Sequence, residues 1–374
     1  MKIALVTNVY PNAPEHTLAV IFEDLGRAYQ RAGHDVVCVW QHRPAKPAFP
    51  AFNMEKLSIP AFLIGGAAPY NSKDRIKKSL RELRRILRSV DWIHFHTAGP
   101  GDRLEAHDRM VISASRGIGL LGVTFHTVSG SSQDALTYYL DGSAWVSVLS
   151  SYESRRVGAI SRSLSRRIHK VPNGVDGELF ESFSKVKTAA SRASPPHPYV
   201  LCLARQAHYK GLDVLLMAWA AVCRKLGGVD LVLVGPDYGR WGHNLKLAEL
   251  LKISHRVHFM GDMRRDAALS LAASSLFCVL PSRHEPFGMA ALEAMALGKA
   301  VVATQTGPAD FIDHGVSGFL VDPGDCSELE RALMRLCLNA RLRARMGTRA
   351  RLAANAFSWD NAASRYISLF KATG

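Results

Sequence analysis

The sequence predicts an α/β protein made of two doubly wound domains. Short apolar segments, typical of buried parallel strands, alternate with amphipathic helical segments in both halves of the chain. A length of 374 residues and a hydrophobic content of 48% suit two domains of ordinary size, each with a core of its own. We expect one domain over residues 1–176, an exposed linker over 177–198, a second domain over 199–356 and a last helix over 357–374.

Composition limits which kinds of partner, membrane segment and cysteine chemistry are expected of this chain. The formal net charge is +15 and is spread over both halves, so we expect an anionic partner. The longest apolar runs are shorter than a membrane-spanning helix, and the run at residues 1–6 is too short for a secretory signal and predicts a first strand. The six cysteines are scattered without a Cys-x-x-Cys pair, which predicts reduced thiols in a cytoplasmic protein rather than disulfides or a zinc site.

Three histidines follow the pattern of strand ends in the first domain. Residues 91–96 form an apolar segment that carries His94 and His96, and residues 122–127 form another that carries His126. Because the carboxyl ends of parallel strands meet at one edge of a sheet, we expect His126 at that edge. The other two either line the same edge or are satisfied by the backbone, since no third ligand at a recognisable spacing makes them a metal site.

A basic helix is predicted over residues 73–90. Its apolar residues repeat along one face, and eight basic residues surround the rest, among them Arg81, Arg84 and Arg85. One interpretation is a helix that packs on the sheet with a solvated basic back. The other is a helix at an anionic membrane surface, which would make the protein peripheral on the inner face of the plasma membrane. Nucleic acid is not expected, because aromatic residues do not accompany the basic ones.

A strand, a tight loop and a helix follow one another directly between residues 275 and 298. Leu276 to Leu280 is a buried-strand pattern, and good helix formers run from Gly288 until Gly298 ends the helix. The backbone N–H groups near residues 287–290 would therefore point out of the carboxyl edge of the second sheet. Such a helix end binds phosphate groups.

Two glutamates bracket this helix end. Glu285 lies in the loop and Glu293 lies about five residues into the helix, roughly 8 Å along its axis. A nucleoside diphosphate sugar has similar dimensions, with its diphosphate at the helix end, its ribose hydroxyls at Glu293 and its sugar hydroxyls at Glu285. Without further motifs, the same residues could be a solvated helix glutamate and a loop glutamate paired with Arg283 or His284.

The residues from Glu285 to Asp325 resemble a known signature. They read Glu-Pro-Phe-Gly, Glu-Ala-Met-Ala-x-Gly, Val-Val-Ala-Thr and a glycine-rich run that ends in Pro-Gly-Asp. This run is similar to the donor-binding signature of the retaining GT-B glycosyltransferases of family 4, also called glycosyl transferases group 1. The resemblance implies a GT-B fold, in which two Rossmann-like domains face each other across a cleft. It also implies a hexosyltransferase that uses a nucleotide sugar, without a metal or other cofactor.

The resemblance assigns roles to single residues. Arg205 and Lys210 would clamp the donor diphosphate, His126 would contact the transferred sugar, and Glu285 completes the expected catalytic set. Ser150, which with Glu153 predicts a capping box, would shape the acceptor side. The last helix would cross back onto the first domain. The expected donor-binding residues are Arg205, Lys210, Met263, Glu285, Phe287, Gly288, Met289 and Glu293, and Arg81, Arg84 and Arg85 are expected on the acceptor or membrane side.

The expected reaction transfers a sugar to the hydroxyl of a sugar or lipid-linked acceptor, as in bacterial polysaccharide, lipopolysaccharide or glycolipid synthesis. Two alternatives stay open: a nucleotide-sugar epimerase on the same fold, which would act without an acceptor, and a non-catalytic subunit that binds nucleotide sugar or membrane. A nicotinamide dehydrogenase is disfavoured, because no Gly-x-Gly-x-x-Gly follows the first strand.

Overall fold

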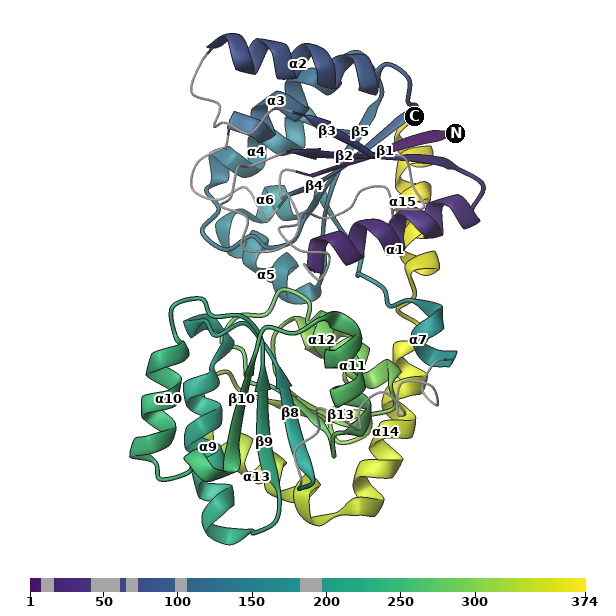
Figure 1. Ribbon diagram of the computed structural model, residues 1–374. Coiled ribbons are helices and arrows are strands. Elements are labelled where there is room, and N and C mark those ends of the chain that lie inside the picture. The colour runs from purple at the N-terminus through teal and green to yellow at the C-terminus, as the bar shows by residue number, and fades with distance from the viewer. Residues whose placement is uncertain (8–16, 42–60, 65–72, 98–105, 182–196) are drawn as a thin grey trace. The chain divides into compact units, whose positions relative to one another are not determined.

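The chain divides into two compact units (Figure 1). The structure is a computed structural model that describes residues 1–7, 17–41, 61–64, 73–97, 106–181 and 197–374. Unit 1 comprises Met1–Gly174 together with Trp359–Gly374, and unit 2 comprises Val175–Ser358. The last segment of the chain thus belongs with the first unit. The two units are described in turn.

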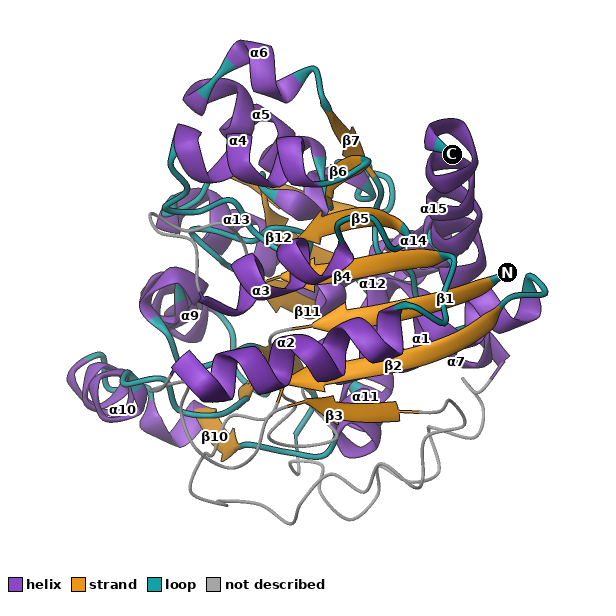
Figure 2. Cartoon of the chain, turned by 90° about the horizontal axis from the view of Figure 1, so that it is seen from above, coloured by secondary structure: helices purple, strands orange, loops and turns teal. Residues whose placement is uncertain are grey.

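Unit 1 is built on a seven-stranded parallel sheet in the order β3-β2-β1-β4-β5-β6-β7. Figure 2 shows these strands side by side. The order reverses between β1 and β4, which makes this pair the topological switch point. The strands are β1 Lys2–Thr7, β2 Asp35–Gln41, β3 Ala61–Ile64, β4 Trp92–Thr97, β5 Leu120–Phe125, β6 Trp145–Val148 and β7 Ile168–Lys170.

Helices cover both faces of this sheet. On one face, α2, α3 and α4 enclose an apolar core that includes Leu83, Val111 and Leu136. On the other face lie α1 and α15, where Trp92 of β4 stacks on Phe370 with ring centroids 4.8 Å apart. The helices of unit 1 are α1 Thr17–Arg31, α2 Lys73–Leu87, α3 Ala106–Ser115, α4 Gln133–Gly142, α5 Ser151–Ile160, α6 Arg162–Ser165 and α15 Trp359–Thr373.

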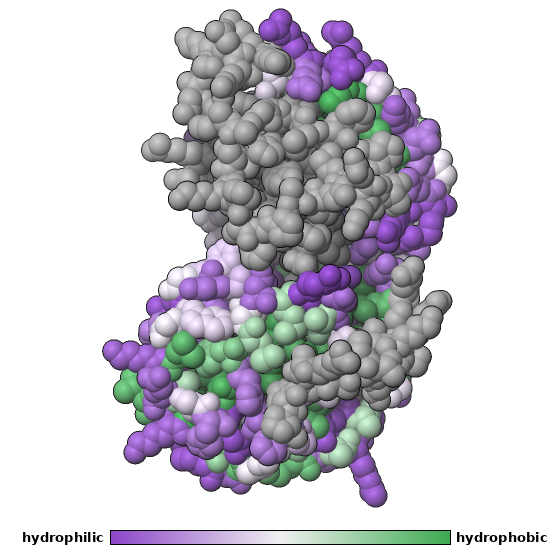
Figure 3. Space-filling view, in the orientation of Figure 1, coloured by the Kyte–Doolittle hydropathy of each residue, from purple (hydrophilic) through white to green (hydrophobic). Residues whose placement is uncertain are grey.

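The basic helix packs with its apolar side inward. In α2, Leu83 and Leu87 are fully buried, whereas Arg81, Arg84 and Arg85 are exposed. Hydrophilic residues, drawn in purple, lie at the top of the space-filling view, where α2 runs (Figure 3). Among the side chains of α2 that the structure describes, these three basic ones are therefore accessible to a partner. None of the helices in the described ranges is both long enough and apolar enough to span a membrane.

Unit 2 is built on a six-stranded parallel sheet in the order β10-β9-β8-β11-β12-β13. Its switch point lies between β8 and β11. The strands are β8 Tyr199–Leu203, β9 Asp230–Val234, β10 Val257–Gly261, β11 Cys278–Leu280, β12 Val301–Thr304 and β13 Gly318–Val321. The α-helices are α7 Gly177–Glu181, α9 Leu212–Lys225, α10 Trp241–Leu250, α11 Arg265–Ser274, α12 Met289–Ala296, α13 Cys326–Leu338 and α14 Ala340–Ala354. Short 3₁₀ segments are η3 His208–Lys210, η4 Ser254–Arg256 and η5 Gly307–Asp310.

The two sheets confirm the predicted α/β fold with two doubly wound halves. Trp219 of α9 and Phe277 before β11 are fully buried in the core of unit 2, as their apolar surroundings in the sequence suggest. The segment expected to be a linker begins with the short helix α7, in which Leu179 is buried. The remainder of that linker between 182 and 196, and the first loop at 8–16, lie outside the described residues.

Candidate active site

The switch point of unit 2 brings two loops together. Residues 204–211 follow β8 and residues 281–288 follow β11, so both loops leave the carboxyl edge of the sheet at neighbouring strands. The backbone N–H of Arg283 donates to the carbonyl of Tyr209 at 2.8 Å. The Arg283 guanidinium also donates to both carboxylate oxygens of Asp213, each at 2.7 Å. Burial raises the pKa of Asp213, but this bidentate pair, together with the backbone N–H groups of Asp213 and Val214, outweighs that effect and leaves the pKa below its ordinary value.

Gly211 allows this close approach. Its φ is +66°, and a Cβ atom on it would lie 2.1 Å from the carbonyl oxygen of Pro281. Any side chain would therefore push the two loops apart. Gly211, which directly precedes α9, is therefore required for the two loops to lie this close together.

Lys210 and Glu285 form an ion pair between the two loops. The Lys210 Nζ lies 2.6 Å from Glu285 Oε2, and the two side chains are only 12% and 11% exposed. Ser282 Oγ donates to the same carboxylate oxygen at 3.3 Å. Arg283, which the sequence offered as a partner for Glu285, instead pairs with Asp213. Two residues predicted to act on the donor are thus in direct contact in unit 2.

The amino end of α12 faces this pair. Gly288 precedes the helix with φ +95°, and a Cβ atom on it would lie 2.7 Å from Pro308 Cγ. Among the described side chains none caps this helix. The first N–H groups of a helix have no partner within it, so those of Met289 and Ala290 are available to an anion. Phe287 is buried against the rings of Phe311 and Phe357, which leaves its backbone as the group that could meet a ligand.

Glu293, one turn further along α12, is held by Arg265. The Arg265 Nε and Nη2 donate to Glu293 Oε1 at 3.1 Å and 2.8 Å. Arg265 begins α11, directly after the loop that contains Met263, which is half-buried. Sequence reasoning missed Arg265. Its place at the first helical position after a strand-end loop was the available signal.

Arg205 lies against two aromatic rings. Its guanidinium carbon is 5.6 Å from the ring centroid of Tyr209 and 5.2 Å from that of Tyr238. The neighbouring Gln206 is fully buried, and its Oε1 accepts a hydrogen bond from Asn244 Nδ2 at 2.7 Å. The Tyr238 N–H donates to the Gln206 carbonyl at 3.2 Å. This buried glutamine, which the sequence did not single out, therefore fixes the loop from which Arg205 extends.

His126 lies at the carboxyl edge of the sheet of unit 1. It comes directly after β5, and its N–H donates to the Thr97 carbonyl at 3.0 Å. Its Nε2 is 3.0 Å from Nδ1 of His96, at the end of β4. Ser150 is fully buried, and its hydroxyl accepts from the Glu153 N–H at 3.2 Å, which confirms the predicted cap of α5. The Glu153 carboxylate accepts from the N–H of Val128, two residues after His126.

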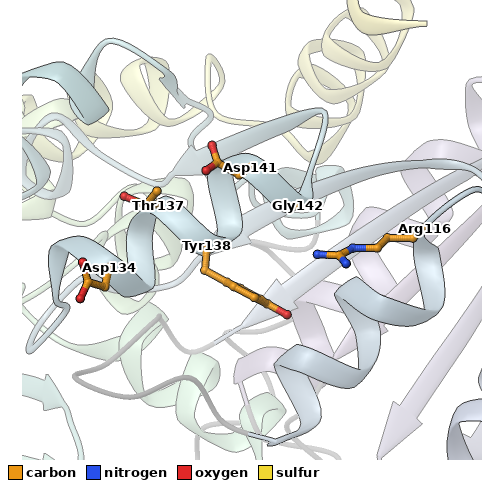
Figure 4. A pocket seen from close by; sticks show the side chains of 6 residues that line it. All are labelled: Arg116, Asp134, Thr137, Tyr138, Asp141 and Gly142. Carbon is orange, nitrogen blue, oxygen red and sulfur yellow. The ribbon is translucent and has the colours of Figure 1, made fainter.

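A hollow lies elsewhere on unit 1, away from these residues. A shallow pocket of about 320 Å³ lies between α4 and the end of α3 (Figure 4). Tyr138 and Arg116 point into the space between these helices. None of the residues predicted to bind the donor line this pocket. Across the described part of the chain, no three His, Cys, Asp or Glu residues are grouped as a metal site would require.

Two family models together match most of the chain. The model of Glycosyltransferase Family 4 matches residues 18–179, and that of Glycosyl transferases group 1 matches residues 185–353. The second match contains every residue predicted here to bind the donor. The chain belongs to the group 1 glycosyltransferases.

Curated relatives of this group 1 glycosyltransferase are named for different acceptors or biosynthetic processes. The chain is 34% identical to a D-inositol 3-phosphate glycosyltransferase of Corynebacterium jeikeium over 54% of this chain and 51% of that protein. It is 38% identical to the lipopolysaccharide core biosynthesis glycosyltransferase LpsE of Rhizobium meliloti over 41% and 43% of the two chains. These matches span about half of those relatives or less. A glycosyltransferase of Methanocaldococcus jannaschii is 27% identical over 99% of this chain and 98% of that one.

Solved structures show the same fold. A glycosyltransferase of Rickettsia africae matches with a TM-score of 0.80 at 18% identity, covering 100% of this chain and 98% of that chain. HepE of Anabaena in complex with UDP-glucose matches with a TM-score of 0.76 at 21% identity, covering all of both chains. The group 1 glycosyltransferase therefore has the GT-B fold that the sequence predicted.

Proposed function

We propose that this glycosyltransferase moves a hexose from a nucleoside diphosphate sugar to an acceptor hydroxyl, with retention at the anomeric carbon and without a bound metal. The acceptor is a carbohydrate or a lipid-linked sugar of polysaccharide, lipopolysaccharide or glycolipid synthesis. Two relatives support this acceptor class, since one is named for lipopolysaccharide core biosynthesis and another for transfer to an inositol phosphate.

One observation carries the proposal. The Lys210–Glu285 ion pair lies beside the amino end of α12, which no described side chain caps, and Glu293 follows on the same helix. A diphosphate at the helix end would neutralise Lys210 and Arg205, while Glu285 accepts hydrogen bonds from the sugar and Glu293 from the ribose. Met263 and Met289 are both half-buried, and we assign them to the side of the donor that carries the base. The complex of HepE with UDP-glucose supports a nucleotide sugar as the donor.

The proposed chemistry needs no protein nucleophile. The bond between the anomeric carbon and the diphosphate oxygen breaks, and a bond from that carbon to the acceptor oxygen forms on the same face. The acceptor proton passes to the departing diphosphate. Negative charge grows on the diphosphate during this step, so Arg205, Lys210 and the α12 N–H groups stabilise the transition state more than the bound donor. Fixed cations take the role that a divalent metal has in other transferases.

Thermal shift measurements test the donor site first. UDP, GDP, ADP, dTDP and their glucose conjugates are compared with EDTA present, on the wild type, Glu293→Ala and the control Glu249→Ala, whose side chain is exposed on α10. We expect one nucleotide to raise the melting temperature of the wild type and the control by several degrees but not that of Glu293→Ala. A shift that requires added Mg²⁺ contradicts metal independence, and equal shifts in all three proteins contradict the assigned site.

Stereochemistry is tested on the product. With the donor that the thermal shift identifies, the anomeric proton coupling of the product distinguishes retention from inversion. An inverted product contradicts the proposed mechanism while leaving the donor site intact. Sugar interconversion without an acceptor would instead support an epimerase.

A further inference from the structure

His96 and His126 form a hydrogen-bonded histidine pair. Nδ1 of His96 lies 3.0 Å from Nε2 of His126. His96 is 1% exposed at the carboxyl end of β4, whereas His126 is half-buried one residue beyond β5. The strands are adjacent, with His96 in register with Thr124. The pair thus connects the interior of unit 1 to the edge where its strands end.

The surroundings of His96 keep its ring neutral. Phe22 packs edge-on at a ring-centroid distance of 5.1 Å, and the His94 ring lies at 4.1 Å. Burial lowers the pKa of His96 well below its ordinary value, and the nearby His94 and His126 lower it further. No carboxylate of the described residues pairs with this ring to offset that effect.

The second ring nitrogen of His96 decides the direction of the hydrogen bond. Its Nε2 is buried and has no hydrogen-bond partner within the ranges that the structure describes. If His96 carried its proton on Nε2, a buried N–H would have no acceptor, which folded proteins strongly avoid. With the proton on Nδ1, only a ring lone pair is left unpaired. His96 therefore donates from Nδ1 to Nε2 of His126.

We propose that His96 is a positioning residue that fixes the ring orientation and the tautomer of His126. His126 then accepts at Nε2 and carries its own proton on Nδ1, so its ring acts as a neutral donor toward an oxygen of the transferred sugar. The part of this inference that concerns the sugar rests on the proposed function. The direction of the hydrogen bond does not.

His94 provides a matched control on the same strand. It is also fully buried, two residues before His96 on the same face of β4. Both of its ring nitrogens are occupied, since Nδ1 is 2.9 Å from Tyr29 Oη and Nε2 is 2.9 Å from Thr124 Oγ1. It makes no hydrogen bond to His126 in the described structure. Loss of His94 should therefore disturb packing without releasing His126.

Nitrogen NMR of the ligand-free protein tests the tautomer. With ¹⁵N-histidine incorporated into the full chain, long-range proton–nitrogen correlations identify which ring nitrogen is protonated. His96→Leu and His126→Gln assign the signals. At pH 7 we expect both His96 and His126 to be neutral and protonated on Nδ1. A His126 signal protonated on Nε2, or a charged His126, overturns the inference.

Turnover of matched variants tests the positioning role. His96→Asn places an amide N–H near the position of Nδ1, whereas His96→Leu removes the donor. With the nucleotide sugar that gives the largest thermal shift, we expect His96→Leu to lower kcat by at least tenfold at unchanged nucleotide binding. His96→Asn should recover most of that loss, and in His94→Leu the His126 tautomer should stay unchanged. Equal losses of kcat in His96→Leu and His96→Asn contradict positioning.

The two readouts separate the two hypotheses. A wild type without turnover on any nucleotide sugar refutes the proposed function, while the NMR result still decides whether His96 fixes the tautomer. Turnover with the opposite tautomer retains the proposed function and refutes the inference.

Discussion

Arg265 engages a single oxygen of Glu293. Its Nε and Nη2 lie 3.1 Å and 2.8 Å from Oε1, with the Glu293 side chain 13% exposed. Arg265 thereby sets the orientation of the carboxylate. Because both of its hydrogen bonds go to Oε1, a ligand could still contact Oε2. The ribose contact proposed for Glu293 thus depends on a residue at the start of another helix, α11.

Arg265→Ala should weaken donor binding more than turnover. Without the two hydrogen bonds, the Glu293 carboxylate loses its fixed orientation, which we expect to raise the donor KM about tenfold, equivalent to about 1.4 kcal/mol. Steady-state kinetics with a saturating acceptor measures the change. Arg264→Ala is the control, because Arg264 pairs with the exposed Asp266 instead. Equal effects of both substitutions contradict this role.

Lys210→Ala should lower kcat by about 10²- to 10³-fold with a smaller change in donor affinity, because Lys210 meets charge that grows in the transition state. Kinetics and donor titration separate the two effects. The substitution also leaves Glu285 unpaired, so Glu285→Gln and the double variant complete a thermodynamic cycle. Additive losses would show that the 2.6 Å pair does not act as a unit. A loss of affinity alone would show that Lys210 acts only in binding.

Gly288→Ala should abolish the thermal shift caused by the nucleotide. A Cβ atom at φ +95° would lie 2.7 Å from Pro308 Cγ and distort the first turn of α12. Gly324→Ala is the matched control, because its φ is +89° but its Cβ would meet no atom within 4 Å. Both variants carry the backbone strain, of about 1–2 kcal/mol. Only Gly288→Ala should lose the nucleotide response, and a loss in both variants contradicts the role of the helix end.

The ionised Asp230 carboxylate should stabilise unit 2 at neutral pH, and this contribution should be lost in acid. Burial raises the pKa of Asp230, but hydrogen bonds from His258, Arg256 and His197 outweigh it, so the pKa lies below its ordinary value. A depressed carboxyl pKa stabilises the fold above the unfolded value, near 4, and that contribution is lost as the pH falls through the folded value.

The comparison of Asp230→Asn with the wild type measures this contribution. We expect the variant to be less stable by about 2 kcal/mol at pH 7, and the difference between their unfolding free energies to shrink toward pH 3. Asp141→Asn is the control, because the Asp141 side chain is 62% exposed and pairs with Arg167 at 3.0 Å. That surface pair should contribute less than about 1 kcal/mol at any pH. A pH-independent difference for Asp230→Asn contradicts the prediction.

Binding to anionic vesicles distinguishes the two interpretations of α2: a helix at a membrane surface should bind them, whereas a helix with a merely solvated basic side should not. Because Leu83 and Leu87 are buried, the contact is electrostatic and should weaken between 50 and about 300 mM salt. Co-sedimentation with vesicles of phosphatidylglycerol and phosphatidylcholine measures binding. The triple variant of Arg81, Arg84 and Arg85 to Ala should lose most of it. The control removes three exposed arginines of α14, Arg341, Arg345 and Arg349, and equal losses would indicate an effect of net charge alone.

Local patterns in the sequence predict much of this protein. The alternation of buried strands and helices predicts both sheets, and the run from Leu276 to Gly298 predicts β11, the loop and α12. The position of His126 at a strand end follows from the same pattern. Such features are predictable because strand burial, helix starts and strand-end loops depend on residues close together in the chain.

Other features were not predicted because they depend on contacts between residues that are distant in the chain. The ion-pair partner of Glu285 is not Arg283 of its own loop but Lys210, 75 residues away. Arg265 is 28 residues from Glu293, and its role has no local signal beyond its helical position. The buried Gln206, which holds the loop of Arg205, is likewise visible only once β8 and β9 lie side by side.

The sequence by itself determined the fold class, the family and the helix end with its two glutamates, because periodicity and short motifs encode these features locally. Only the tertiary structure decided which charges pair and which ring nitrogen of His96 is left without a partner. Those outcomes follow from strand order, which brings β4 against β5 and β8 against β11. A linear pattern does not specify which distant side chains such an order places within hydrogen-bond distance.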